Sequence, residues 1–328
     1  MSISRRNFVR ALGLSSVALY SGSSLSAQVE RNQPLFTISL AQWSLHRTIF
    51  GSSQDDGQSF NELLRTDPDR ILQGTLAPLD FAMTARQEFD IDAIEYVNVF
   101  FFGHARDAAY LRELQQRSND AGVKNLLIMC DFEGRLGDPN STERTKAIEN
   151  HHKWVEAAAF LGCHSIRVNA GSTGSWSEQA KLAADGLTTL ADYADTHDID
   201  VIVENHGGLS SNGQWLQSVM ELGNHRRLGT LPDFGNFNLG DGELYDNYQG
   251  VTELMPYAKA VSAKSYDFDS DGNETELDYE RMMRIVLDAG YRGWVGIEYE
   301  GGQLEELTGI RATKSLLERV RDKLATEY

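Results

Sequence analysis

The chain has 328 residues, enough for one large α/β domain or, as the less favoured alternative, two small ones. Its 48 acidic and 30 basic side chains give a formal net charge of −18. So acidic a surface repels nucleic acid and anionic lipid. This disfavours both as partners and favours a small neutral or metal-bound ligand.

The first residues have the pattern of an export signal. The paired arginines Arg5 and Arg6 are followed by a phenylalanine, a third arginine and a mildly apolar run that ends at Tyr20. This pattern is typical of a twin-arginine signal peptide, and a basic amphipathic N-terminus is the alternative. The apolar run is too short to span a bilayer as a helix. We therefore expect a signal peptide at 1–27 and an exported, periplasmic domain at 28–328, with no membrane anchor after cleavage.

From residue 35 onward, stretches with the patterns of strands and helices alternate. Apolar, mostly β-branched runs predict strands at 35–45, 91–102, 123–130, 164–170, 200–204, 228–233, 258–266 and 293–299. Helical spacing of apolar residues predicts helices at 106–121, 142–161, 178–196, 213–222, 245–257, 278–289 and 304–326. The segment 49–89 is long for one connection, and two helical patches in it, at 61–65 and 78–88, are expected to cap one end of the fold.

Eight strands alternating with helices, without a repeat or a linker, predict an α/β fold: a single-domain (β/α)8 TIM barrel. A doubly wound open sheet is the alternative. No G-x-G-x-x-G follows the first strand, which counts against dinucleotide binding. The two cysteines, Cys130 and Cys163, fall at opposite ends of neighbouring predicted strands, so we expect no disulfide between them.

Acidic side chains end three of the predicted strands. Glu204 ends the fifth, Asp233 the sixth and Glu298 lies near the end of the eighth. The carboxyl ends of barrel strands form the active face of this fold, so the three carboxylates are expected to converge. They cannot all stay ionised unless a cation or a proton shares the site, and oxygen ligands favour Mn²⁺ or Mg²⁺. The alternative is that each pairs with a nearby cation, Arg167 and Lys264 being candidates.

Four segments resemble the sugar phosphate isomerase/epimerase superfamily of xylose isomerase-like TIM barrels, which includes ketose 3-epimerases, hydroxypyruvate isomerase, inosose dehydratase and endonuclease IV. They are V-I-V-E-N-H-G-G at 201–208, L-P-D-F-G-N-F at 231–237, A-K-S at 263–265 and G-Y-R-G-W-V-G-I-E-Y-E-G at 290–301. In the superfamily, a Glu, an Asp, a His and a Glu on strands five to eight bind one divalent metal.

The resemblance implies that Glu204, Asp233 and Glu298 are metal ligands. The histidine of strand seven is replaced by Ser262, and the histidine that follows the aspartate of strand six is replaced by Asn236. One of four ligands is therefore missing. A water molecule, Asn236 or His206 is expected to fill the gap, or the charge of Lys264 to replace part of the cation.

The resemblance further implies a reaction on a small sugar or keto-sugar. Glu204 and Glu298 would be the catalytic acid and base, one removing a proton to form an enediolate and the other returning it. The remaining polar or aromatic residues predicted to bind the substrate are His206, Lys264, Arg167, Asn169, Glu95, Asn236 and Trp43.

Several alternatives remain open on sequence alone. The same chemistry can end in elimination, which would make the protein a lyase or hydratase acting on 3-keto-glycosides. The missing histidine also suits an inactive sugar-binding barrel. An endonuclease IV relative ranks last, because the chain has only 8 histidines and a net charge of −18. The sequence leaves open whether the chain forms a homo-oligomer, and whether the acidic segment 267–278 binds calcium or is a solvated turn, the favoured interpretation.

Overall fold

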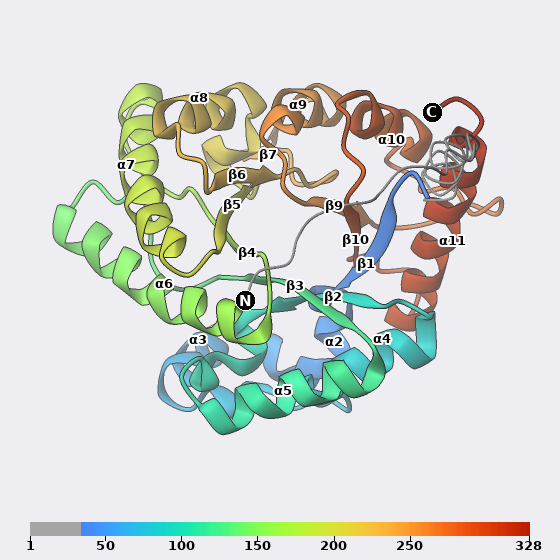
Figure 1. The fold of residues 1–328 in the computed structure, drawn as a ribbon, viewed down its shortest axis with the longest axis horizontal. Coiled ribbons are helices and arrows are strands. Elements are labelled where there is room, and N and C mark those ends of the chain that lie inside the picture. Colours follow the sequence, from blue (N-terminus) through green and yellow to red (C-terminus); the bar gives the residue numbers. More distant parts are fainter. Residues whose placement is uncertain (1–33) are drawn as a thin grey trace, which may run out of the picture. The chain divides into compact units, whose positions relative to one another are not determined.

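Eight parallel strands form the central sheet of the computed structural model, which describes residues 34–328 (Figure 1). The strands are β1 (Thr37–Ala41), β2 (Ala93–Val97), β3 (Lys124–Met129), β4 (Ser165–Val168), β5 (Asp200–Glu204), β6 (Leu228–Leu231), β9 (Val261–Ser265) and β10 (Trp294–Tyr299). The predicted signal peptide, residues 1–27, lies outside the described residues.

The sheet closes on itself. Its strand order is β6-β5-β4-β3-β2-β1-β10-β9, and parallel bridges from Thr230 to Ala258 and from Asp233 to Ser262 join the two ends. This closure confirms the predicted (β/α)8 barrel and excludes the open doubly wound sheet.

Helices surround the strands on the outside (Figure 1). They are α2 (His46–Phe50), α3 (Gly57–Thr66), α4 (Phe81–Phe89), α5 (Ala108–Ala121), α6 (Ser141–Leu161), α7 (Trp176–Asp195), α8 (Gly213–Gly223), α9 (Asn247–Leu254), α10 (Tyr279–Asp288) and α11 (Glu306–Leu324). Gly122 and Gly162 end α5 and α6 in the left-handed conformation that glycine adopts readily. Among residues 34–328, no helix has the length and apolarity needed to span a membrane.

The first two strands are shorter than predicted. β1 ends at Ala41 and β2 at Val97, and each continues as a 3-10 helix, at Gln42–Leu45 and Asn98–His104. Both helical segments are mostly buried, and apolar residues occur in each of them, Trp43 and Leu45 in the first and the run 99–102 in the second. A continuous apolar run cannot tell a buried strand from a buried helix, which explains the error.

A two-stranded hairpin after β6 was not predicted. It consists of β7 (Asn238–Gly240) and β8 (Glu243–Leu244), and its turn contains Asp241 with a φ of 51° and Gly242 with a φ of 81°. Such short strands of small and polar residues carry no alternation of apolar and polar positions that the sequence could reveal.

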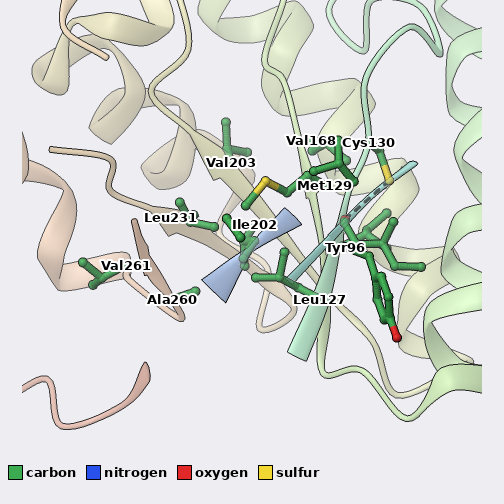
Figure 2. Packing of buried hydrophobic residues seen from close by; sticks show 14 of the residues in the cluster. Tyr96, Leu127, Met129, Cys130, Val168, Ile202, Val203, Leu231, Ala260 and Val261 are labelled. Carbon is green, nitrogen blue, oxygen red and sulfur yellow. Dashed lines mark hydrogen bonds between the residues drawn. The ribbon is translucent and has the colours of Figure 1, made fainter. Parts of the chain in front are cut away.

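One hydrophobic core joins the barrel to its helices. Figure 2 shows Leu127, Ile202 and Leu231, from β3, β5 and β6, within this core. Strands covered on both faces are expected to be apolar along their length, as residues 201–203 of β5 are between its polar ends. Cys130 and Cys163 are both buried and free, as predicted.

The acidic segment 267–278 folds as a turn whose side chains bind its own backbone. Asp269 Oδ1 accepts hydrogen bonds from the backbone N–H groups of Asp271 and Asn273, both at 2.9 Å. Asp278 caps α10 by accepting from the Arg281 N–H. The carboxylates are thus engaged in local structure, in line with the favoured interpretation.

Candidate active site

Three carboxylates meet at the carboxyl ends of the barrel strands. Glu204 is the last residue of β5, Asp233 lies two residues after β6, and Glu298 is the penultimate residue of β10. One oxygen from each lies within 4.8 Å of the other two. All three side chains are buried. In residues 34–328, this is the one group of three or more His, Cys, Asp or Glu side chains arranged closely enough to hold a metal ion.

Asp233 is held by contacts on both sides of its carboxylate. Oδ1 accepts from the backbone N–H groups of Gly235 at 2.9 Å and Asn236 at 2.7 Å. Oδ2 accepts from the hydroxyl of Ser262 at 2.7 Å. Asn205 fixes the backbone, since its amide accepts from Asp233 N–H at 2.8 Å and donates to Asp233 C=O at 3.1 Å. Ser262, which stands in place of the superfamily histidine, therefore orients a carboxylate.

Two buried cations approach the glutamates. Arg167 Nε lies 2.7 Å from Glu204 Oε2, although the N–H is not aligned for a hydrogen bond. Lys264 Nζ lies 3.1 Å from Glu298 Oε1 and 3.4 Å from Glu300 Oε1. The ion-pair alternative raised by the sequence thus holds for Glu204 and Glu298, whereas Asp233 pairs with a hydroxyl and two backbone amides.

Asn236 links the two glutamates through the lysine. Its Oδ1 accepts from Lys264 Nζ at 2.9 Å, and its Nδ2 donates to Glu204 Oε1 at 2.8 Å. The side chain therefore already has a partner at each end. The chain Glu298–Lys264–Asn236–Glu204 spans the site and fixes the spacing of its two candidate proton-transfer groups.

The site carries more negative than positive charge. Burial raises the pKa of Glu204, and Glu298 adds to this while Arg167 opposes it. Burial likewise raises the pKa of Asp233 against the attraction of Lys264. Burial alone would lower the pKa of Lys264, but the surrounding carboxylates raise it well above its ordinary value, so the amine stays protonated.

This excess of negative charge suits a cation. Glu204 Oε2 and Glu298 Oε2 are buried and accept no hydrogen bond. Buried carboxylate oxygens without donors are costly unless a proton or an ion satisfies them. With the oxygens of Asp233, they form an all-oxygen donor set of the kind that Mg²⁺ and Mn²⁺ prefer. The residues present therefore fit a divalent ion.

A cavity of about 320 Å³ opens beside the carboxylates. Its lining residues are Trp43, Val97, Met129, Asp131, Phe132, Arg167, His206, Glu298 and Glu300. The volume is at the lower end of the range of about 300–1,000 Å³ that small-molecule sites occupy. Three larger hollows are lined by other residues: one by α9 and α10, one by α10, α11 and the segment 273–278, and one by α7 and α8.

Trp43, Arg167 and His206 all line this cavity. The indole of Trp43 is fixed, since Nε1 donates to Glu300 Oε1 at 2.5 Å and the ring stacks on His46 with centroids 4.8 Å apart. Burial lowers the pKa of His206, and Arg167 lowers it further, so the imidazole is neutral near pH 7. Asn169 stands behind the wall and donates to Asp131 Oδ1 at 2.8 Å.

Glu95 is not part of this cavity. It lies within β2, accepts from the Ser39 hydroxyl at 2.6 Å and faces a hollow of about 300 Å³ lined also by Lys259 and Tyr291. Gly296 makes room for it, because a Cβ there would lie 2.5 Å from Glu95 Oε1. The mid-strand position of Glu95, two residues short of the strand end, was the signal that it lies deeper in the barrel.

Two acidic residues of the cavity were absent from the predicted site. Glu300 follows Glu298 by two positions, so alternation along the strand brings both side chains to the same face. Asp131 comes two residues after β3 and accepts from Arg167 Nη1 at 2.8 Å. Both positions follow the rule that polar residues at strand ends form the active face, applied to strands three and eight.

The site has the location and composition typical of a known family. Residues 84–321 match the family described as xylose isomerase-like TIM barrel. The chain belongs to this family. Its fold is that of structural neighbours that are sugar epimerases and isomerases.

Individual relatives are similar over different parts of the chain. The C-glycoside deglycosidase alpha subunit of Arthrobacter globiformis is 34% identical over 73 residues, which cover 20% of this chain and 21% of the relative. The match thus spans about a fifth of that protein. The 3-keto-D-glucoside 4-epimerase YcjR from E. coli has a TM-score of 0.62 at 16% identity, covering 75% of this chain and 95% of its own.

A third similar protein was crystallised with a metal. A xylose isomerase-like TIM barrel protein from Mycobacterium smegmatis, in complex with magnesium, has a TM-score of 0.61 at 15% identity and covers 89% of this chain and 97% of its own. At such identity, the likeness of the two solved structures establishes the shared fold alone.

Proposed function

We propose that this chain is an exported, divalent-metal-dependent isomerase or epimerase that acts on a small keto-sugar. The observation that supports this most strongly is the meeting of Glu204, Asp233 and Glu298, buried and within 4.8 Å of one another, beside a ligand-sized cavity. Gathering three buried carboxylates costs free energy, and Glu204 Oε2 and Glu298 Oε2 accept no hydrogen bond. Chemistry at the site explains this arrangement better than stability does.

Glu204, Asp233 and Glu298 would hold the metal ion. When bound, a divalent ion there supplies Lewis-acid chemistry that makes a C–H bond next to a carbonyl more acidic. Ser262 and the two backbone amides keep the Asp233 carboxylate in one orientation. Mn²⁺ and Mg²⁺ are the ions that this oxygen-rich set favours.

Proton transfer is assigned to the two glutamates. One removes the proton from the carbon next to the ketone, which gives an enediolate, and the other returns it to the opposite face or to the neighbouring carbon. The raised pKa of Glu204 suits this task, because a group that titrates near neutral pH can both accept and release a proton. Lys264 and Asn236 are hydrogen-bonded to one another, and together they keep the two carboxylates at a fixed spacing.

The cavity wall would bind the sugar. His206 and Arg167 offer hydrogen bonds to hydroxyl groups, and the fixed indole of Trp43 offers a flat face for a sugar ring. An exported enzyme with an acidic surface would meet few sugar phosphates and would repel them. We therefore favour an unphosphorylated keto-sugar. The likeness to a 3-keto-glucoside epimerase and to a deglycosidase subunit supports a 3-keto-glycoside.

Elimination on a 3-keto-glycoside is the second candidate. Here the proton leaves C2, the electron pair forms a C1–C2 double bond, and the C1 substituent departs with its bonding electrons and takes up a proton. The products are an unsaturated keto-sugar and a free aglycone. The similarity to the C-glycoside deglycosidase alpha subunit is the observation that supports this second candidate.

Proton exchange would test both reactions. The protein is incubated with Mn²⁺ and methyl 3-keto-β-glucoside in D₂O, and the sugar is followed by ¹H NMR. Deuterium at an α-carbon with a new stereoisomer would support epimerisation, and release of methanol would support elimination. Glu204→Gln and Glu298→Gln should each lower the exchange rate by at least about 100-fold. Glu62→Gln, which alters an exposed carboxylate on α3, is the matched control. No exchange and no product with the unaltered protein would contradict the proposal.

A further inference from the structure

An aromatic side chain stands exposed at the rim of the cavity. Phe132 lines the cavity, yet 58% of its surface is accessible to solvent. Its backbone has a φ of 63°, in the left-handed region that a bulky residue rarely adopts. Unfavourable backbone conformations cluster at binding and catalytic sites, so this one, beside the cavity, points to a role in binding.

The residues immediately before and after Phe132 in the chain are held in place by hydrogen bonds and an ion pair, and this keeps its ring directed outward. Before it, Asn98 accepts from the Asp131 N–H at 3.0 Å and donates to the Asp131 C=O at 2.9 Å. After it, the buried carboxylate of Glu133 accepts from Trp154 Nε1 at 2.5 Å and lies 2.8 Å from Lys153 Nζ. Because both neighbouring residues are fixed inward, the ring of Phe132 is directed to the rim by the fold.

Two buried aromatic rings, which do not line the cavity themselves, connect Phe132 to Trp43. The ring centroid of Phe132 lies 6.4 Å from that of Phe60 on α3, and Phe60 lies 5.2 Å from Phe50. Phe50 in turn lies 6.2 Å from Trp43. The extended first loop thus supplies an aromatic row from the fixed indole of Trp43 to the rim. These separations are typical of favourable ring contacts.

The cavity wall is divided by chemistry. Arg167, His206 and Glu298 form part of a polar side beside the carboxylate cluster, whereas Trp43 and Phe132 belong to an apolar side. A free sugar carries hydroxyl groups around its whole ring and would leave Phe132 uncovered. A sugar joined to a planar apolar group would match both sides, with the sugar between the polar groups and the indole of Trp43 and the apolar group on Phe132.

We propose that Phe132 is the platform of a subsite for an aromatic aglycone, so that the substrate is an aryl glycoside rather than a free keto-sugar. The inference rests on the proposed function, since the sugar must sit at the carboxylates for its aglycone to reach the rim. Phe132 is here a specificity-determining residue that contacts the substrate without taking part in proton transfer.

The test compares an aryl with an alkyl substrate. The ratio of kcat/KM for phenyl 3-keto-β-glucoside over methyl 3-keto-β-glucoside is measured with Mn²⁺ for the unaltered protein, Phe132→Ala and Phe132→Leu. The alanine variant should lower the ratio about tenfold, because stacking and apolar contact with the phenyl ring are lost. The leucine variant should lower it less. Phe160→Ala, which removes an aromatic ring that is 40% exposed on α6, should leave the ratio unchanged.

Binding separates this inference from the proposed function. The affinity for unreactive phenyl β-glucoside, relative to methyl β-glucoside, is measured by saturation-transfer NMR. Loss of the phenyl preference in Phe132→Ala, with no turnover of either keto-sugar by any form, would support the subsite and contradict the proposed function. Turnover with a ratio that Phe132→Ala leaves unaltered would support the proposed function and overturn the subsite. An equal loss for both substrates would also overturn it.

Discussion

Replacing Glu95 by glutamine is expected to reverse a pH-dependent loss of stability. Burial, opposed by the hydrogen bond from Ser39, raises the pKa of Glu95 from 4.5 to about 7 in the folded protein. The folded state therefore binds this proton more tightly than the unfolded state does. The protonated Glu95 therefore contributes to the free energy of unfolding. This contribution is fully present below about pH 4.5 and is lost as the pH rises through about 7. At about 1.36 kcal/mol per pKa unit, the loss amounts to about 3 kcal/mol.

Glu95→Gln keeps the shape and the acceptor for Ser39 but stays neutral at every pH. We expect the free energy of unfolding of the variant, relative to the unaltered protein, to rise by about 2.5 kcal/mol between pH 5 and pH 8, since part of the full effect is already lost at pH 5. Urea denaturation with EDTA at both pH values measures this difference. Glu62→Gln, at an exposed position, should show no such rise. An equal stability difference at pH 5 and pH 8 for Glu95→Gln would refute the reasoning.

Three further changes test other parts of the chain. Lys264→Met leaves buried carboxylates without their cation and should lower the free energy of unfolding at pH 7 by about 3 kcal/mol in urea, whereas the exposed Lys323→Met should have little effect. Gly296→Ala forces a methyl group against Glu95 and should lower the midpoint of urea denaturation by an amount equivalent to about 1–3 kcal/mol. Changing Arg5 and Arg6 to lysine should retain the protein in the cytoplasm, as cell fractionation would measure; continued export would contradict the predicted signal.

Local patterns explain why much of the fold was predictable. Asp200–Glu204 was predicted with the observed bounds, since it is an uninterrupted β-branched run that ends in polar residues. Helices α5 and α6 end at the glycines that the sequence places there. The same reasoning overextended the first strand to residue 45, because Trp43 and Leu45 in the 3-10 turn after Ala41 continue an alternating pattern of apolar and polar residues.

The acidic residues of the site could be predicted from the sequence, but the hydrogen bonds that link them could not. Their positions at strand ends predicted that Glu204, Asp233 and Glu298 converge. In the structure, one carboxylate oxygen of each lies within 4.8 Å of the other two. The link from Glu204 through Asn236 to Lys264 joins residues that are 32 and 28 positions apart along the chain. Such contacts depend on strand tilt and side-chain length, which no local pattern encodes.

Manganese binding tests the central claim most directly. The claim is that three carboxylates from separate strands act together on one ion. Titration of the metal-free protein with Mn²⁺, followed by electron paramagnetic resonance, should give one ion per chain. Asp233→Asn should weaken binding at least about 100-fold, because even the loss of an outer-shell partner costs about 10–100-fold. Asp269→Asn, in the acidic turn, should bind as the unaltered protein does. Unchanged affinity in Asp233→Asn, or loss of binding in Asp269→Asn, would contradict the claim.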